Sequence, residues 1–195
     1  MKHEGWTSGD LSSDGMAALD AYERLLLEIA IPRGMVASSD REHLRDRHIL
    51  DSLRAIPYIR GGGSVIDLGS GAGLPGIPIA VARPDLVLTL AESRQPRAAF
   101  LELVVQRLKL TNVHVFPGPV AELPSGGAAV CLARGFGDAA RSWAVARDLL
   151  SPDGDLIYWA GRSFSRRHAP REARITAIAP ATLESGGPIV IMTRQ

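Results

Sequence analysis

Residues 64–78 read SVIDLGSGAGLPGIP, a short apolar strand that runs directly into a glycine-rich loop and the start of a helix. Glycine is needed where a backbone turns tightly and lies against a ligand, because a Cβ would stand in the way. The helix that follows offers unpaired N–H groups at its N-terminus. The stretch therefore predicts that a flat or anionic group binds at Gly69, Gly71 and Gly73.

Outward from this loop, short apolar segments alternate with helical ones, which is the pattern of a mostly parallel sheet. Only an irregular segment, 161–173, precedes the last two strands, so these are expected to form an antiparallel end. We expect strands near 64–68, 86–91, 113–116, 128–133, 154–160, 174–179 and 188–194, and helices near 75–82, 94–108 and 138–149. The sequence predicts an α/β, Rossmann-like sheet.

Two amphipathic helices are expected before the sheet. Apolar residues from Gly15 to Ala30 recur at helical spacing until Pro32 breaks the pattern. Ser39 and Glu42 have the spacing of a capping box at the start of a second helix, which ends before Pro57. With the glycine run 61–63 as a hinge, we expect an N-terminal helical extension over 1–60 and one Rossmann-like domain over 61–195.

The composition suits a single domain, since 195 residues with 46% apolar content can bury a substantial core. No apolar run reaches the roughly eighteen residues of a membrane span, and the polar residues 1–10 contain no signal-peptide block. We therefore expect a soluble, cytoplasmic protein, a monomer that binds no membrane. The single cysteine, Cys131, lies in an apolar run, so it is expected to be buried and no metal is expected. The net charge of +1 neither requires nor excludes nucleic acid.

Glu92 follows the second expected strand, where a carboxylate can accept hydrogen bonds from two ribose hydroxyls. No Gly-Lys-Ser or Gly-Lys-Thr follows the glycines, so a triphosphate-binding loop is disfavoured. The glycines satisfy G-x-G-x-x-G, which leaves a dinucleotide open, as well as a purely structural turn. Asp67 would repel a pyrophosphate but could order a loop facing the cationic amino acid end of S-adenosylmethionine, so the charge favours this cofactor.

Several segments carry a resemblance to one known family. They are Asp46-Arg47-His48-Ile49-Leu50-Asp51-Ser52-Leu53, the stretch 65–78, Ala82-Arg83-Pro84, Glu92-Ser93, Arg97 and Phe100-Leu101. Together they resemble the bacterial 16S (small-subunit) ribosomal RNA guanine-N7 methyltransferase family, called RsmG or GidB. The resemblance implies S-adenosylmethionine as the cofactor and 16S ribosomal RNA or the small ribosomal subunit as the partner. It also implies cofactor contacts at Gly69, Leu74, Val120, Ala121 and Arg134.

The chain departs from the family at several positions. Ala160 stands where the family usually has a lysine before Gly161, Gly135-Phe136 follows Arg134 in place of an alanine-containing sequence, and Pro96 replaces a common basic residue. Residues 34–37 read GMVA, where the family usually has Asn-Leu-Thr. These departures leave open a methyltransferase for another RNA or a small molecule, or a catalytically weakened relative that binds cofactor or RNA.

Guanine N7 has a lone pair and no proton, so methyl transfer to it needs no general base and no catalytic residue is expected. The enzyme would hold the nucleophile in line with the methyl group in a site cleared of water. The stretch 132–136 also lacks the Asn/Asp-Pro-Pro-aromatic tetrad that is common in methyltransferases for exocyclic amines.

The RNA-binding candidates are arginines. Arg134 ends the fourth expected strand, where it could bridge cofactor and RNA phosphate, and Arg47 is a second candidate. The densest basic stretch is Arg162, Arg166, Arg167, Arg171 and Arg174, of which we select Arg162, Arg166 and Arg167 as phosphate ligands. His48, Trp143 and Trp159 are expected to pack in the core.

Overall fold

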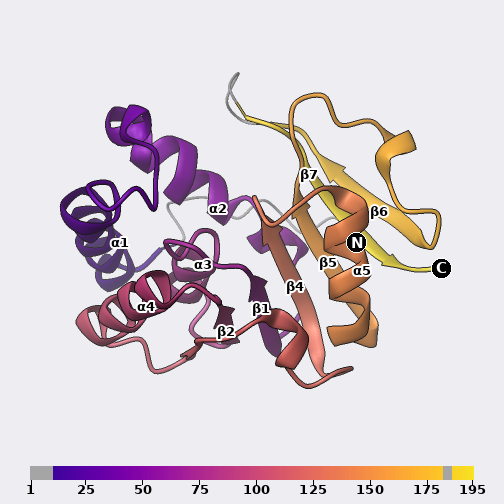
Figure 1. The fold of residues 1–195 in the computed structure, drawn as a ribbon, viewed down its shortest axis with the longest axis horizontal. Coiled ribbons are helices and arrows are strands. Elements are labelled where there is room, and N and C mark those ends of the chain that lie inside the picture. The colour runs from indigo at the N-terminus through magenta and orange to yellow at the C-terminus, as the bar shows by residue number, and fades with distance from the viewer. Residues whose placement is uncertain (1–10, 182–185) are drawn as a thin grey trace.

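A computed structural model describes residues 11–181 and 186–195. Seven strands form one sheet in the order β3-β2-β1-β4-β5-β7-β6 (Figure 1). The strands are β1 (Ser64–Leu68), β2 (Val87–Ala91), β3 (Val113–Phe116), β4 (Ala128–Arg134), β5 (Leu150–Trp159), β6 (Ala173–Ala179) and β7 (Ile189–Arg194). Strands β1 to β5 pair in parallel, and β7 runs antiparallel to both β5 and β6. The predicted fold class, including its antiparallel end, is confirmed.

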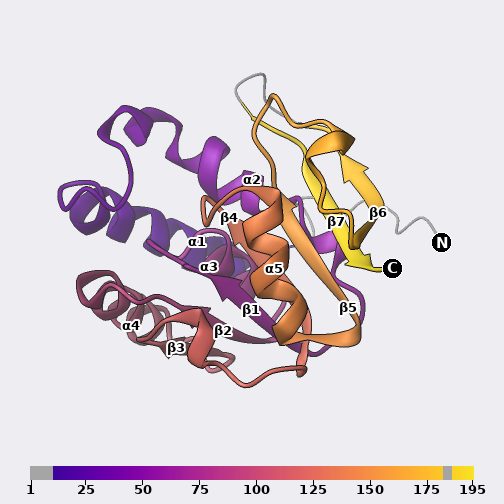
Figure 2. The ribbon, with the colours of Figure 1, turned by 45° about the vertical axis from the view of Figure 1, so that its right-hand side comes forward.

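Helices cover both faces of the sheet. They are α1 (Ser13–Leu25), α2 (Asp51–Leu53), α3 (Gly76–Ala82), α4 (Gln95–Leu108) and α5 (Ala139–Leu149). Alternate strand residues point to opposite faces. Val65, Val130 and Ile157 share a core with α1, α3 and α4, whereas Ile66 and Cys131 share a second core with α5. Figure 2 shows α5 lying over β4 and β5.

Most predicted bounds in the sheet domain agree with the structure to within about one residue, but β5 begins earlier than expected, at Leu150. Leu150 pairs with Ala128 and Asp155 pairs with Val130, so residues 151–154 form an irregularity in the pairing of β5 with β4. At Gly154 a Cβ would lie 2.8 Å from the carbonyl oxygen of Ala128. Glycine therefore extends the strand here because the two backbones approach closely. The predicted burial of Cys131, Trp143 and Trp159 is confirmed.

The second N-terminal helix differs from its prediction. It consists of a 3₁₀ segment (Ser38–His43), a π-helical segment (Arg45–Leu50) and the short α2. The predicted capping box is wrong, because the 3₁₀ segment begins after Ala37 and no side chain caps it. Ser39 and Glu42 are both exposed. The first helix matches its expected range, with α1 continuing into a π-helical turn, Leu26–Ala30.

The N-terminal helices pack directly on the sheet and its helices. Leu19 and Leu26 share one core with Ile77 and Leu101, and the fully buried Tyr22 donates its hydroxyl proton to the carbonyl oxygen of Ala72, at 2.7 Å. The predicted boundary near residue 60 stays a prediction, and residues 1–10, with their expected lack of a signal block, lie outside the described residues. Each helix within residues 11–181 and 186–195 is too short or too polar to span a bilayer.

Replacing Tyr22 by Phe should lower the free energy of unfolding by about 1–3 kcal/mol, because the buried carbonyl of Ala72 loses its partner. Urea denaturation would measure this loss. The same substitution at the half-buried Tyr58 is the matched control and should change stability by less than about 0.5 kcal/mol. Equal losses of stability at the two positions would show that the hydrogen bond from Tyr22 to Ala72 does not stabilise the glycine loop.

Candidate functional site

The glycine loop lies at the carboxyl end of β1, next to the end of β4. The strand order reverses between these two strands, and ligands of open α/β sheets bind at such a point. Gly69 has a φ of +64°, and a Cβ there would lie 2.8 Å from the ring of Phe136. At Gly73, with a φ of +96°, a Cβ would lie 2.6 Å from Ile77. The predicted loop is therefore present, with Gly73 required for packing.

The Asp67 side chain contacts the glycine loop from the protein interior. It is buried, and its Oδ2 accepts a hydrogen bond from the backbone N–H of Gly76 at 3.0 Å. Burial raises the pKa of Asp67 to about 7, and the Gly76 hydrogen bond opposes part of that shift. The carboxyl thus orders the loop, as the sequence suggested, from a position within the protein interior.

Glu92 also binds the loop. Its Oε2 accepts from the N–H of Gly71 at 3.0 Å, and its Oε1 accepts from the N–H of Arg94 at 2.8 Å. Each carboxylate oxygen has a second lone pair that can accept another hydrogen bond. Glu92 therefore joins the glycine loop to the end of β2 and keeps the acceptor capacity that a ribose diol needs.

A cavity of 270 Å³ opens beside the loop. One wall comes from the loop itself, including Gly69, Gly71 and Leu74, and another comes from the segment between the two N-terminal helices. The lining residues are Met35, Val36, Ala37, Asp40, His48, Gly69, Ser70, Gly71, Ala72, Leu74, Arg97, Arg134 and Gly135. Four of the predicted residues, Gly69, Gly71, Leu74 and Arg134, thus line one cavity, together with residues 35–37, to which the sequence gave no role.

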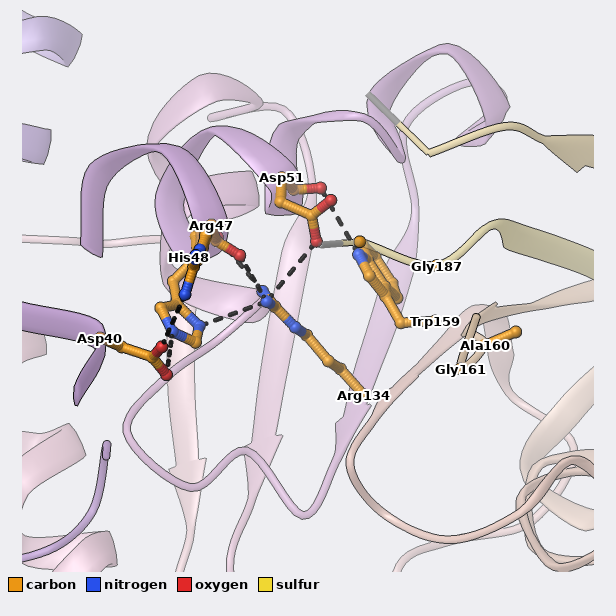
Figure 3. Close-up of a pocket in the computed structure, with 10 residues that line it drawn as sticks. Asp40, Arg47, His48, Asp51, Arg134, Trp159, Ala160, Gly161 and Gly187 are labelled. Atoms are coloured by element: carbon orange, nitrogen blue, oxygen red, sulfur yellow. Dashed lines mark hydrogen bonds and ion pairs between the residues drawn. The ribbon is translucent and has the colours of Figure 1, made fainter. Parts of the chain in front are cut away.

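Arg134 reaches from the end of β4 to the second N-terminal helix (Figure 3). One guanidinium nitrogen donates to the carbonyl oxygen of His48, at 3.2 Å, and to the hydroxyl of Ser52, at 3.3 Å. The other donates to the carbonyl oxygen of Arg47, at 2.7 Å, and lies 3.5 Å from the Asp51 carboxylate. Burial lowers the pKa of Arg134, so these acceptors stabilise a largely desolvated cation.

His48 connects Arg134 to Asp40. Its Nδ1 lies 3.2 Å from a guanidinium nitrogen of Arg134, which can only donate, so Nδ1 is the acceptor. Its Nε2 therefore carries the proton and donates to Asp40 at 3.0 Å. Burial and the Arg134 charge lower the pKa of His48. The predicted core histidine is instead a neutral, partly exposed link between two charged side chains.

Arg134, His48 and Asp40 also line a neighbouring cavity of 340 Å³. Arg47 lies at its rim, 38% exposed and 3.5 Å from Asp40, and Ala160 and Gly161 form its opposite side (Figure 3). Asp40 and Asp51 were not selected from the sequence. Asp51 lies in the segment 46–53 that resembles the family, so the resemblance could have identified it. Nothing in the sequence distinguished Asp40.

The remaining predicted residues lie apart from these two cavities. Val120 and Ala121 lie in a 3₁₀ turn after β3, with Val120 buried in the core beneath α5 and Ala121 exposed. Arg162, Arg166 and Arg167 are exposed on the segment after β5, and no ion pair involves them among the described residues. Their assignments as cofactor and RNA ligands stay predictions.

Residues 16–180 match the family model GidB, described as rRNA small subunit methyltransferase G. The chain belongs to this family. A ribosomal RNA small subunit methyltransferase G from Neisseria meningitidis serogroup C is 37% identical over 155 residues, covering 77% of this chain and 72% of the relative. The one from Salinispora arenicola is 36% identical over 191 residues, covering 92% and 79%. The family predicted from the sequence is confirmed.

Solved structures support the fold. A putative S-adenosyl-L-methionine-dependent methyltransferase from Methanococcus maripaludis covers 98% of both chains with a TM-score of 0.57 and 15% identity. A mutant of MtNAS in complex with S-adenosylmethionine covers 92% of this chain and 73% of its own, with a TM-score of 0.65 and 15% identity. The methyltransferase family thus has the Rossmann-like sheet that the sequence predicted.

The raised pKa of Asp67 predicts a pH dependence of stability. Between an unfolded pKa of about 3.9 and the folded value of about 7, the folded protein holds a proton that the unfolded chain releases. The contribution of this carboxyl to stability is therefore complete below pH 4 and is lost as the pH rises to 7. Relative to Asp67→Asn, the wild type should lose up to about 4 kcal/mol over this range.

Urea denaturation of both proteins across this pH range would measure the difference. Asp85→Asn is the control, because the Arg83 guanidinium lowers the pKa of Asp85 and gives its contribution the opposite sign. A constant difference between the wild type and Asp67→Asn would contradict the buried, protonated carboxyl.

Proposed function

We propose that this chain transfers the methyl group of S-adenosylmethionine to N7 of a guanine in 16S ribosomal RNA. The observation that carries the proposal is the convergence of the glycine loop, Glu92 and Arg134 at the reversal point of the sheet, in a member of this family. The loop and the arginine line one cavity, and Glu92 binds the loop.

The residues present fit the cofactor. Gly69, Gly71 and Leu74 would border its amino acid portion, and Glu92 would accept hydrogen bonds from the ribose hydroxyls through its remaining lone pairs. Val120 and Ala121 follow β3 at the same edge of the sheet, where they would contact the adenine. When bound, the cofactor supplies an electrophilic methyl group on a sulfonium. Asp67 would act indirectly, by holding Gly76 and the loop in place.

The target nitrogen needs no deprotonation, so we assign no catalytic residue. The contribution of the protein would be to hold the guanine in line with the methyl group and to exclude water. The 340 Å³ cavity adjoins the cofactor cavity through Asp40, His48 and Arg134. We place the guanine on this side, because the three shared residues are all that the two linings have in common.

We assign RNA phosphates to Arg47, Arg162, Arg166 and Arg167, whose side chains or segments are exposed. Arg134 was predicted to contact RNA directly. Its hydrogen bonds to residues 47–52 support a different role, in which it orients the segment that presents Arg47. We further propose that the protein acts in the cytoplasm as a monomer without a metal ion.

The cofactor assignment predicts a specific sensitivity at the loop. Gly71→Leu should abolish S-adenosylmethionine binding, because Gly71 lines the cavity at a φ of +60°. Isothermal titration calorimetry of the wild type should give a stoichiometry near one per chain. Gly126→Leu is the control, since it introduces the same backbone strain, at a φ of +76°, away from the cavity. Unaltered affinity in Gly71→Leu would refute the assignment.

The reaction itself can be tested by mapping modified nucleotides in ribosomal RNA from a strain that lacks this protein. We expect one N7-methylguanine to disappear from the small-subunit RNA and to return when the wild-type chain, but not Gly71→Leu, is restored. An unchanged set of methylated guanines would exclude the proposed substrate and leave another RNA or a small molecule.

The exposed arginines should bind RNA without affecting the cofactor. Replacing Arg162, Arg166 and Arg167 together with Ala should weaken RNA binding and reduce its salt dependence by up to about three phosphate contacts. Affinity for small-subunit RNA would be measured across a salt series, and S-adenosylmethionine affinity should be unchanged. A salt slope equal to that of the wild type would show that these arginines are only a solvated surface.

A further inference from the structure

A cavity of 320 Å³ lies on the α5 side of the sheet, at the carboxyl end of β5. It is lined by Asp138, Ala139, Ala140, Tyr158, Gly161, Ser163, Phe164 and His168. Gly161 also lines the 340 Å³ cavity beside Arg134. Tyr158 belongs to the core beneath α5, whereas Trp159 belongs to the opposite core. The two cavities therefore meet at Gly161 from the two faces of the sheet.

Two aromatic rings form part of this cavity. Phe164 and His168 lie edge to face, with ring centroids 6.1 Å apart and planes at 69°. Nδ1 of His168 accepts a hydrogen bond from the N–H of Ser165 at 3.1 Å. The neutral ring therefore carries its proton on Nε2, which is left as a donor. Rings of this kind are platforms on which unstacked RNA bases pack.

Asp138 supplies an acceptor to the same cavity. Its Oδ1 caps α5 by accepting from the N–H of Arg141, at 2.8 Å, whereas its Oδ2 has no hydrogen bond to a described residue. Tyr158 is held by donating to the carbonyl oxygen of Gly137, at 3.2 Å. Asp138 and Tyr158 both line this cavity, and burial and the Asp138 charge raise the pKa of Tyr158.

The surroundings carry the charge that RNA requires. Arg162, Arg166 and Arg167 belong to the same segment as Phe164 and His168, and all three are exposed. The cavity combines aromatic rings with one carboxylate, and the segment that lines it is rich in arginine. It therefore suits a nucleobase whose flanking phosphates bind to these arginines outside the cavity. Its volume lies within the roughly 300–1,000 Å³ range of small-ligand pockets.

We propose that this cavity binds one unstacked base of the substrate RNA, close to the guanine that is methylated, and that Asp138 selects a base with an exocyclic amino group. A carboxylate accepts from an amino group, as in recognition of cytosine N4, and repels the carbonyl oxygen that uracil has at the same position. This inference rests on the proposed function, because it assumes that RNA reaches this edge of the sheet.

Cytosine has an amino group at C4 where uracil has a carbonyl oxygen, and its N3 is an acceptor where uracil has an N–H group. Short oligonucleotides of the two bases therefore test the selection. Binding of pentacytidylate and pentauridylate to the full chain would be measured by fluorescence anisotropy at fixed salt. Guanine is left out because the methyl-transfer site would bind it. We expect the wild type to bind pentacytidylate about tenfold more tightly.

Asp138→Asn is the decisive variant. Asparagine keeps the cap on the Arg141 N–H and replaces the second acceptor with an amino donor, so the preference should shift to pentauridylate. Phe164→Leu retains an apolar side chain but removes the aromatic ring, and should weaken binding of both oligonucleotides. Arg107→Ala, on the exposed side of α4, is the control for loss of charge and should preserve the preference.

Equal binding of the two oligonucleotides by the wild type, or an unchanged preference in Asp138→Asn, would overturn the inference. Cofactor affinity and thermal unfolding of each variant verify its fold. Methyl transfer to small-subunit RNA is measured separately. If transfer fails while the base preference is observed, the proposed function is refuted, and of the inference only the base preference of the cavity stands.

Discussion

The arrangement of the site depends on the hydrogen bonds and the ion pair that the Arg134 guanidinium makes. The guanidinium extends from the carboxyl end of β4 and binds carbonyl, hydroxyl and carboxylate oxygens of residues 47–52. Because the cation is largely buried, losing these acceptors would leave it unpaired at a cost of several kcal/mol. The contact therefore fixes the second N-terminal helix above the sheet edge. It also places His48 and Asp40 beside the glycine loop, where they line the 270 Å³ cavity.

The sequence predicted the sheet and the loop because both depend on local patterns. Short apolar segments that alternate with helical ones located the seven strands of the described sheet, and the glycines could be read directly as a turn. The environments of Asp67 and Arg134 depend instead on contacts between distant segments. Burial of Asp67 requires the loop to fold back so that Gly76 meets the carboxyl, and Arg134 finds its partners more than eighty residues earlier in the chain. A single sequence does not reveal either pairing.

The same reasoning explains why the predicted capping box of the second N-terminal helix was wrong. Ser39 and Glu42 satisfy a local capping rule, but the segment is ordered by Asp40, which binds Arg47 and His48. The family-like stretch 46–53 thus supplies structural contacts to Arg134 as well as the partly exposed Arg47. Ala160, where the family usually has a lysine, is buried in the wall of the adjoining cavity, and its N–H donates to the carbonyl oxygen of Pro188. This hydrogen bond fixes the backbone of Ala160 against the start of the antiparallel end of the sheet.

A crystal structure with S-adenosylhomocysteine tests the account most directly. The amino acid portion should occupy the cavity beside Gly69 and Gly71, the ribose hydroxyls should lie within hydrogen-bond distance of Glu92, and Arg134 should still bind residues 47–52. A ligand bound elsewhere, or a ribose that does not reach Glu92, would contradict the assignment of the cofactor site.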